Sequence, residues 1–239
     1  MTKPKEVVSE QSPAPAVPNI FVSISGDQKR GKTHLACTFP APILVMSFDV
    51  GARFVIDKHF SDKEITLKEY SLPIVESTNE PVTGVEKVWK DIQKDFDTAC
   101  ESGKFKTIVI DTGTALWEIV RYAYKEETSK MKLPPLGYVE PNARFLALFQ
   151  KARAVGINFV ITNHMKDEYA NNQPTGEKVL DGFKRTAGYA DICLSMTRVG
   201  EKKDTKFVAT IDDCRFDPFL TGEAIDMPDY DTLIAMIGV

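Results

Sequence analysis

Short apolar runs alternate along the chain with segments whose apolar residues recur at helical spacing. Uninterrupted apolar runs are typical of strands buried on both faces, and recurrence every three or four residues is typical of a helix with one buried side. Strands are expected at 20–25, 43–48, 65–75, 107–110 and 157–162, and helices at 32–39, 85–102, 115–128 and 142–155. This alternation predicts an α/β fold with a mostly parallel central sheet flanked by helices.

The pattern changes in the last third of the chain. Apolar runs at 190–196 and 206–211 lie on either side of Gly200 and predict a late antiparallel hairpin, followed by a helix at 229–237. Two long polar stretches, 129–141 with three prolines and 166–188 with several glycines, show no clear period and are expected to be loops. Loops longer than about 12 residues are uncommon in compact domains unless they have a function.

The first 18 residues differ from the rest of the chain. They are rich in Pro, Ala, Ser and charge and show no apolar period, which predicts a disordered tail. Such a tail is either a flexible leader or a segment that binds a partner. Residues 19–239 are long enough for one domain with a sizeable core.

Composition excludes several functional classes. The net charge of −4 means that any anion binding must be local. The cysteines are far apart and form no C-x-x-C pair, so neither a zinc site nor a disulfide framework is expected. No apolar run approaches the length of a membrane span, and the N-terminus lacks an apolar signal core. We therefore expect a cytoplasmic protein without a membrane partner.

Candidate chemistry is concentrated in GDQKRGKTH, residues 26–34, between the first expected strand and a helix. The spacing G-x-x-x-x-G-K-T is the Walker A pattern of P-loop NTPases, and the flanking strand and helix distinguish it from an ordinary polar turn. The two glycines allow the backbone to direct its N–H groups inward, and the positive end of the helix adds to this anion site. The predicted nucleotide-binding residues are Gly26, Asp27, Gln28, Lys29, Arg30, Gly31, Lys32, Thr33 and His34.

Within this segment two side chains have distinct expected roles. Lys32 is expected to reach the β- and γ-phosphates, and the Thr33 hydroxyl to bind Mg²⁺. A P-loop of this type requires an apolar strand that ends in an acid near the metal. The segment TIVID ends at Asp111, so Thr33 and Asp111 are the predicted metal ligands, Asp111 through water.

At this point the chain resembles the core of the RecA/RadA recombinase family of ATPases. GDQKRGKTH is similar to the Walker A segment of that family, TIVIDTGTAL to its Walker B strand, and INFVITNH to the next strand. The resemblance extends over about residues 19–216 and implies a RecA-like P-loop NTPase that binds ATP and Mg²⁺. Short members of this kind include phage-encoded recombination and single-strand annealing ATPases, which implies the cytoplasm of a bacterial host.

The resemblance also implies roles for residues that the motifs alone do not assign. His164 stands where the family senses the γ-phosphate, although a histidine at a strand end can also be purely structural. Arg215, in FVATIDDCRF, matches a cation that reaches the ATP site of a neighbouring subunit, whereas Asp213 stands where a second cation is expected. A role for Arg215 therefore requires self-assembly into a ring or filament.

The two long polar stretches fall where the family has its DNA-binding loops. Single-stranded DNA is therefore an expected partner, and the candidate contacts are Lys130, Lys132, Lys166, Lys178, Lys184 and Arg185. The second stretch also carries acidic residues that bring its charge close to zero, so both stretches can also be simple surface loops.

One departure from the family concerns the catalytic base. The family places a glutamate just past the second strand, where this chain has Val50 or Gly51, and Asp49 is the nearby acid. Either Asp49 orients the attacking water or hydrolysis is slow and ATP acts mainly as a switch. Glu118 is a weaker candidate for the base.

Two functional hypotheses follow from the sequence. The first is an ATPase acting on single-stranded DNA in recombination or annealing, and the alternative is a nucleotide-dependent interaction module with little hydrolysis.

Overall fold

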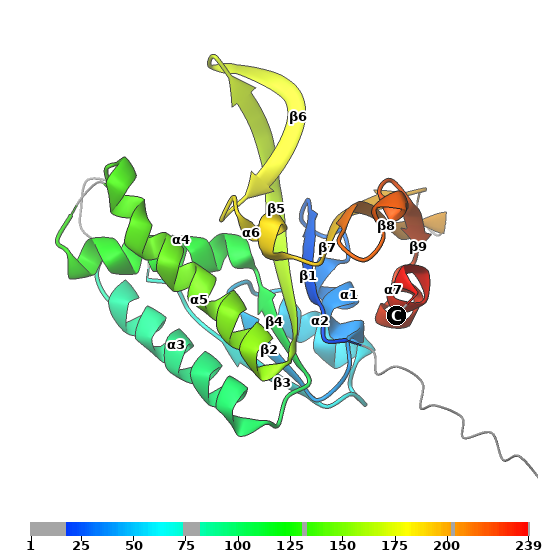
Figure 1. Ribbon diagram of the computed structural model, residues 1–239, viewed down its shortest axis with the longest axis horizontal. Coiled ribbons are helices and arrows are strands. Elements are labelled where there is room, and N and C mark those ends of the chain that lie inside the picture. Colours follow the sequence, from blue (N-terminus) through cyan, green and yellow to red (C-terminus); the bar gives the residue numbers. More distant parts are fainter. Residues whose placement is uncertain (1–17, 74–81, 131–132, 202–203, 239) are drawn as a thin grey trace, which may run out of the picture.

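A computed structural model describes residues 18–73, 82–130, 133–201 and 204–238. The predicted tail, apart from Pro18, lies outside these residues. A central sheet runs through the molecule with helices on both faces (Figure 1). The predicted α/β fold, with a mostly parallel sheet and a late antiparallel hairpin, is confirmed.

Six strands form the parallel part of the sheet. Most contain a buried apolar run of the kind that a sheet covered on both faces requires, whereas the edge strand at 65–69 is only half-buried. In spatial order they are β3 (Ile65–Glu69), β2 (Ile43–Ser47), β4 (Thr107–Asp111), β5 (Asn158–Ala170), β1 (Phe21–Gly26) and β7 (Ile192–Val199). Because parallel strands end at the same edge, the residues that follow β1, β2, β4 and the buried part of β5 meet there.

Two helical layers cover the sheet, and each encloses its own apolar core. One layer holds α3 (Val85–Ser102), α4 (Gly113–Glu127) and α5 (Val139–Val155), and the other holds α1 (Lys32–Thr38), α2 (Ala52–His59) and α7 (Tyr230–Ile237). Trp89, Phe96 and Phe145 are fully buried in the first core. Within the described ranges, no helix is both long enough and apolar enough to cross a bilayer.

The late part of the chain adds antiparallel strands to the sheet. β7 pairs with β8 (Lys206–Cys214), which pairs with β9 (Ala224–Asp226) after the short η3 turn (Pro218–Leu220). Gly200 follows β7 with φ of 86°, and a side chain there would meet the carbonyl of Asp204. A glycine is therefore required at this position of the predicted hairpin.

The expectation that residues 166–188 form a loop is wrong. β5 continues beyond the sheet to Ala170 and pairs with β6 (Gln173–Asp181), and these two strands form a hairpin that projects from the body (Figure 1). Asn171 and Asn172, at φ of 53° and 62°, form the turn, and asparagine tolerates this backbone region better than most residues. The strand pattern is absent from the sequence because both faces of this projecting hairpin, residues 164–181, are largely polar and exposed. The short α6 (Thr186–Tyr189) follows it.

Smaller differences concern element ends. The predicted loop at 129–141 contains η1 (Pro135–Tyr138) and the start of α5, where Pro141 is tolerated because it lies in the first turn; residues 131–132 lie outside the described residues. The strand predicted at 65–75 ends at Glu69, and residues 74–75 are not described. α4 begins two residues early because the Thr112 side chain accepts a hydrogen bond from the Ala115 N–H. The helix α2 and the strand β9 were not predicted.

Candidate nucleotide-binding site

The segment 26–34 has the geometry of a phosphate-binding loop. β1 ends at Gly26, whose backbone passes so close to β7 that a side chain would lie 2.6 Å from the carbonyl oxygen of Met196. Gly31, at φ of 85°, precedes the first residue of α1. The chain therefore turns from a buried strand into a helix N-terminus within five residues, an arrangement that favours anion binding.

Lys32 lies at the centre of this loop. It is only 6% exposed, and its Nζ donates hydrogen bonds to the carbonyl oxygens of Gly26 at 2.8 Å and Asp27 at 2.7 Å. Burial lowers the pKa of its ammonium group, and the nearby carboxylates of Asp111, Asp27 and Asp49 oppose that shift. The ammonium group is therefore held within the loop by neutral acceptors that an anionic ligand can replace.

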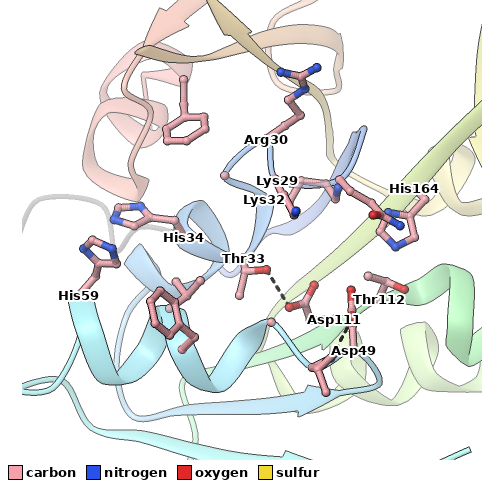
Figure 2. A pocket seen from close by; sticks show the side chains of 17 residues that line it. Lys29, Arg30, Lys32, Thr33, His34, Asp49, His59, Asp111, Thr112 and His164 are labelled. Carbon is pink, nitrogen blue, oxygen red and sulfur yellow. Dashed lines mark hydrogen bonds between the residues drawn. The ribbon is translucent and has the colours of Figure 1, made fainter. Parts of the chain in front are cut away.

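Thr33 and Asp111 are adjacent in space. The Thr33 hydroxyl donates a hydrogen bond to Oδ2 of Asp111 at 2.9 Å (Figure 2). The Thr162 hydroxyl donates to Oδ1 of the same carboxylate. Asp111 is 3% exposed; burial raises the pKa of its carboxyl group, and the two threonine hydrogen bonds lower it. A hydroxyl and a carboxylate are ligands that Mg²⁺ accepts, so this predicted pair fits a metal site.

Asp49 is the better placed of the two candidate bases. It follows β2, lines the same cavity as Asp111, and its Oδ1 accepts a hydrogen bond from the Val50 N–H at 2.7 Å (Figure 2). Glu118 lies on the exposed side of α4, pairs with Arg121 at 3.7 Å and does not line this cavity. The geometry therefore favours Asp49 over Glu118.

His164 also faces this cavity, from the end of the buried part of β5. Its Nδ1 is buried and has no hydrogen-bond partner among the described residues. Burial and the charge of Lys32 lower the pKa of its imidazole, which favours the neutral ring. A neutral histidine with an unpaired nitrogen at the cavity can donate to a ligand or accept from one.

The cavity itself has a volume of about 650 Å³, within the range of small-molecule sites. Its polar wall is the loop at 28–33. Its other wall carries apolar side chains that were not among the predicted site residues. Val50 and Phe54 are 94% and 68% exposed, and Phe207 reaches in from β8. His34 lies beside His59 with ring centroids 5.4 Å apart. An anion-binding wall opposite an apolar wall suits a nucleotide, which joins a polyanionic phosphate chain to an apolar base.

Thr114 connects the site to the projecting hairpin. Its hydroxyl accepts a hydrogen bond from the His164 N–H at 2.9 Å and donates one to the carbonyl oxygen of Asp181.

We expect Thr114→Val to lower the free energy of unfolding by about 1–3 kcal/mol, because it leaves both backbone groups without the Thr114 hydroxyl as a partner. Thr114→Ser, which keeps the hydroxyl, should differ little from wild type in urea denaturation. Equal stability of the Val and Ser variants would contradict this role.

Arg215 lies away from the cavity. It follows β8 at the edge of the sheet opposite to Gly26, where Cys214 pairs with Ile192. Its Nε lies 3.4 Å from Oδ1 of Asp191, which is buried and also pairs with Arg153 at 3.0 Å. Arg215 cannot complete the site of its own chain, so its predicted role in a neighbouring site stays a prediction.

The DNA-binding candidates are scattered. Lys166 pairs with Asp181 at 2.9 Å and Lys178 with Asp27 at 2.6 Å, so the two lysines of the projecting hairpin are already engaged. Lys184 and Arg185 are exposed near α6, Lys130 is exposed beyond the far end of α4, and Lys132 lies outside the described residues. The 15 residues of α4 span ~22 Å, with the stretch at 129–141 following its C-terminal end and Asp181 of the other stretch contacting its first turn.

Comparisons with known proteins bear on the fold and the family of the chain. A KaiC-like protein from the hyperthermophilic archaeon Pyrococcus horikoshii OT3 has a similar structure, with a TM-score of 0.52 and 13% identity over 87% of this chain and 85% of the other. That similarity shows a shared RecA-type P-loop fold. No curated protein sequence matches the chain. The family described as an AAA domain matches residues 19–212, which include the whole phosphate-binding loop, Asp111 and His164. The chain therefore belongs to this AAA domain family.

Proposed function

We propose that the protein binds ATP together with Mg²⁺ and hydrolyses it. The observation that carries this proposal is the convergence of Lys32, Thr33 and Asp111 on one cavity. These side chains come from a helix N-terminus and the end of a buried strand, so they are held in place before any ligand arrives. A preorganised cation and a hydroxyl–carboxylate pair are the groups that phosphoryl transfer requires.

The residues around the cavity would have separate roles in nucleotide binding and hydrolysis. The Lys32 ammonium group would leave the carbonyl oxygens of Gly26 and Asp27 and neutralise phosphate charge. Thr33 and Asp111 would hold Mg²⁺, which neutralises phosphate charge as the terminal bond breaks. Asp49 would orient the attacking water, and His164 would contact the γ-phosphate. The apolar side chains of Val50 and Phe54 would pack against the base.

For the biological role we propose action on single-stranded DNA in recombination or annealing, as in short phage-encoded ATPases. Exposed Lys130, Lys184 and Arg185 are available for phosphate contacts. The position of Arg215 at the edge opposite to the cavity suits head-to-tail assembly, which produces rings or filaments. In such an assembly Arg215 would exchange its pairing with Asp191 for the phosphates of a neighbouring site.

A second candidate function is a nucleotide-dependent interaction module with little hydrolysis. Two observations favour it. The projecting hairpin carries four acidic residues against two lysines, and both lysines are paired within the chain. The carboxylate of Asp49 accepts a hydrogen bond from the Val50 N–H, and its side chain is one methylene shorter than that of a glutamate. Asp49 would therefore orient an attacking water less effectively, which favours slow hydrolysis.

Nucleotide binding and turnover of the purified protein distinguish these functions. We expect ATP binding that requires Mg²⁺, and phosphate release that single-stranded DNA accelerates and double-stranded DNA does not. Electron microscopy with a slowly hydrolysed ATP analogue and single-stranded DNA should show rings or filaments. Binding of ATP without any response to DNA would support the interaction module, and absence of Mg²⁺-dependent binding would overturn both functions.

A further inference from the structure

The projecting hairpin contacts the phosphate-binding loop directly. Lys178 on β6 forms an ion pair with Asp27, the first residue after Gly26, at 2.6 Å between Nζ and Oδ1. The same Asp27 accepts a hydrogen bond from Lys32 at its carbonyl oxygen. One residue of the loop is therefore held by two lysines, one from the loop and one from a strand 151 positions away.

This pair lies beside the cavity rather than in it. Among the described residues that line the cavity, the loop contributes Gln28 to His34, and neither Asp27 nor Lys178 takes part. Hydrogen bonding to Lys178 lowers the pKa of Asp27, so its carboxylate is charged at neutral pH. A negative charge one residue from the phosphate site opposes the binding of an anion unless a cation compensates it.

We propose that Lys178 is a positioning residue for the nucleotide: it neutralises and holds Asp27, and so makes the projecting hairpin a part of the nucleotide site. This inference rests on the proposed binding of a nucleoside triphosphate at the cavity. Lys178 acts through Asp27 and does not touch the ligand. The Thr114 hydroxyl holds the base of the same hairpin against α4, and the pair of Lys178 with Asp27 is a second contact, which joins the hairpin to the loop.

Thermodynamic linkage determines the direction of the effect. If the ion pair favours nucleotide binding, then nucleotide binding must favour the ion pair by the same factor. A bound triphosphate would therefore hold the hairpin more firmly against the loop. The two side chains are 47% and 42% exposed, so the pair is easily broken and the coupling is modest.

A double-mutant cycle tests this proposal. We expect Lys178→Gln to weaken the affinity for a fluorescent ATP analogue with Mg²⁺ by roughly two- to fivefold, in low salt. In an Asp27→Asn background, which has no carboxylate to compensate, Lys178→Gln should have no further effect. Lys178→Arg should retain wild-type affinity. Lys151→Gln removes a similarly exposed partner of Asp97 on the helical layer and should change affinity less than Lys178→Gln.

Hydrogen exchange supplies a readout that affinity alone does not give. The amides of β6 should exchange more slowly with the analogue bound in wild type, and this protection should be lost in Lys178→Gln. An equal loss of affinity in both backgrounds would overturn the proposal, and so would unchanged affinity or unprotected β6 amides in wild type. If the wild-type protein itself binds no nucleotide, the proposed function is wrong. The wild-type measurement therefore distinguishes that failure from a failure of the proposal about Lys178.

Discussion

Replacement of Lys32 by Ala is expected to reduce ATP turnover by roughly 100-fold or more. Removal of a single preorganised donor from an active site typically costs a factor of 10²–10³ in turnover. Among the described residues Lys32 is the one lysine that is buried, whereas Lys29 and Arg30, which also line the cavity, have exposed or half-exposed side chains. Phosphate release under saturating ATP and Mg²⁺ measures the effect.

Two comparisons separate loss of catalysis from loss of fold. Lys94→Ala, which removes an exposed lysine from α3, should leave turnover unchanged. The melting temperature of Lys32→Ala should stay within a few degrees of wild type, since the lost hydrogen bonds to Gly26 and Asp27 are offset by removal of a buried charge. A Lys32→Ala protein that keeps more than a tenth of wild-type turnover would exclude the proposed role of this lysine.

The parts of the site that the sequence predicted are those with strong local rules. Spacing alone located Lys32 and Thr33, because a tight loop between a strand and a helix needs glycines at fixed positions. Asp111 followed from an apolar run that ends in an acid. The parallel register then brings the ends of β1, β2, β4 and β5 to one edge, which is why residues far apart in sequence line one cavity.

The parts that sequence reasoning missed are those set by tertiary contacts. The projecting hairpin has no alternation of apolar and polar residues because neither face packs on a core, so its pattern resembles that of a loop. Phe54 belongs to a helix of eight residues that is too short and too polar to give a clear period, and Val50 lies in the turn just before it. The pairing of Lys178 with Asp27 joins segments whose proximity only the fold determines. No local rule in the sequence marks any of these features.

Replacement of Asp111 by Asn is expected to abolish turnover while leaving the fold as stable as wild type or more stable. The loss of a carboxylate beside Thr33 removes a metal ligand, and we expect at least a roughly 100-fold lower turnover. Asp212 is the matched control. Partial desolvation raises the pKa of its carboxyl group too, and it accepts a hydrogen bond from Ser195, but it is more exposed than Asp111 and does not line the cavity. Asp212→Asn should keep wild-type turnover.

The stability of the Asp111→Asn protein follows from the direction of the pKa shift. Burial raises the pKa of Asp111 above its ordinary value of 3.8, so the folded protein binds this proton more tightly than the unfolded chain does. The free energy of unfolding of the wild-type protein therefore decreases as pH rises from 3.8 through the pKa of Asp111 in the folded state. At neutral pH the carboxylate is charged, and the whole cost of burying that charge opposes folding. Denaturation without nucleotide and with EDTA should show the variant equal to or above wild type at pH 7, and no advantage below pH 3.8. A variant that is clearly less stable than wild type at pH 7 would mean that the hydrogen bonds from Thr33 and Thr162 outweigh the cost of burying the charge.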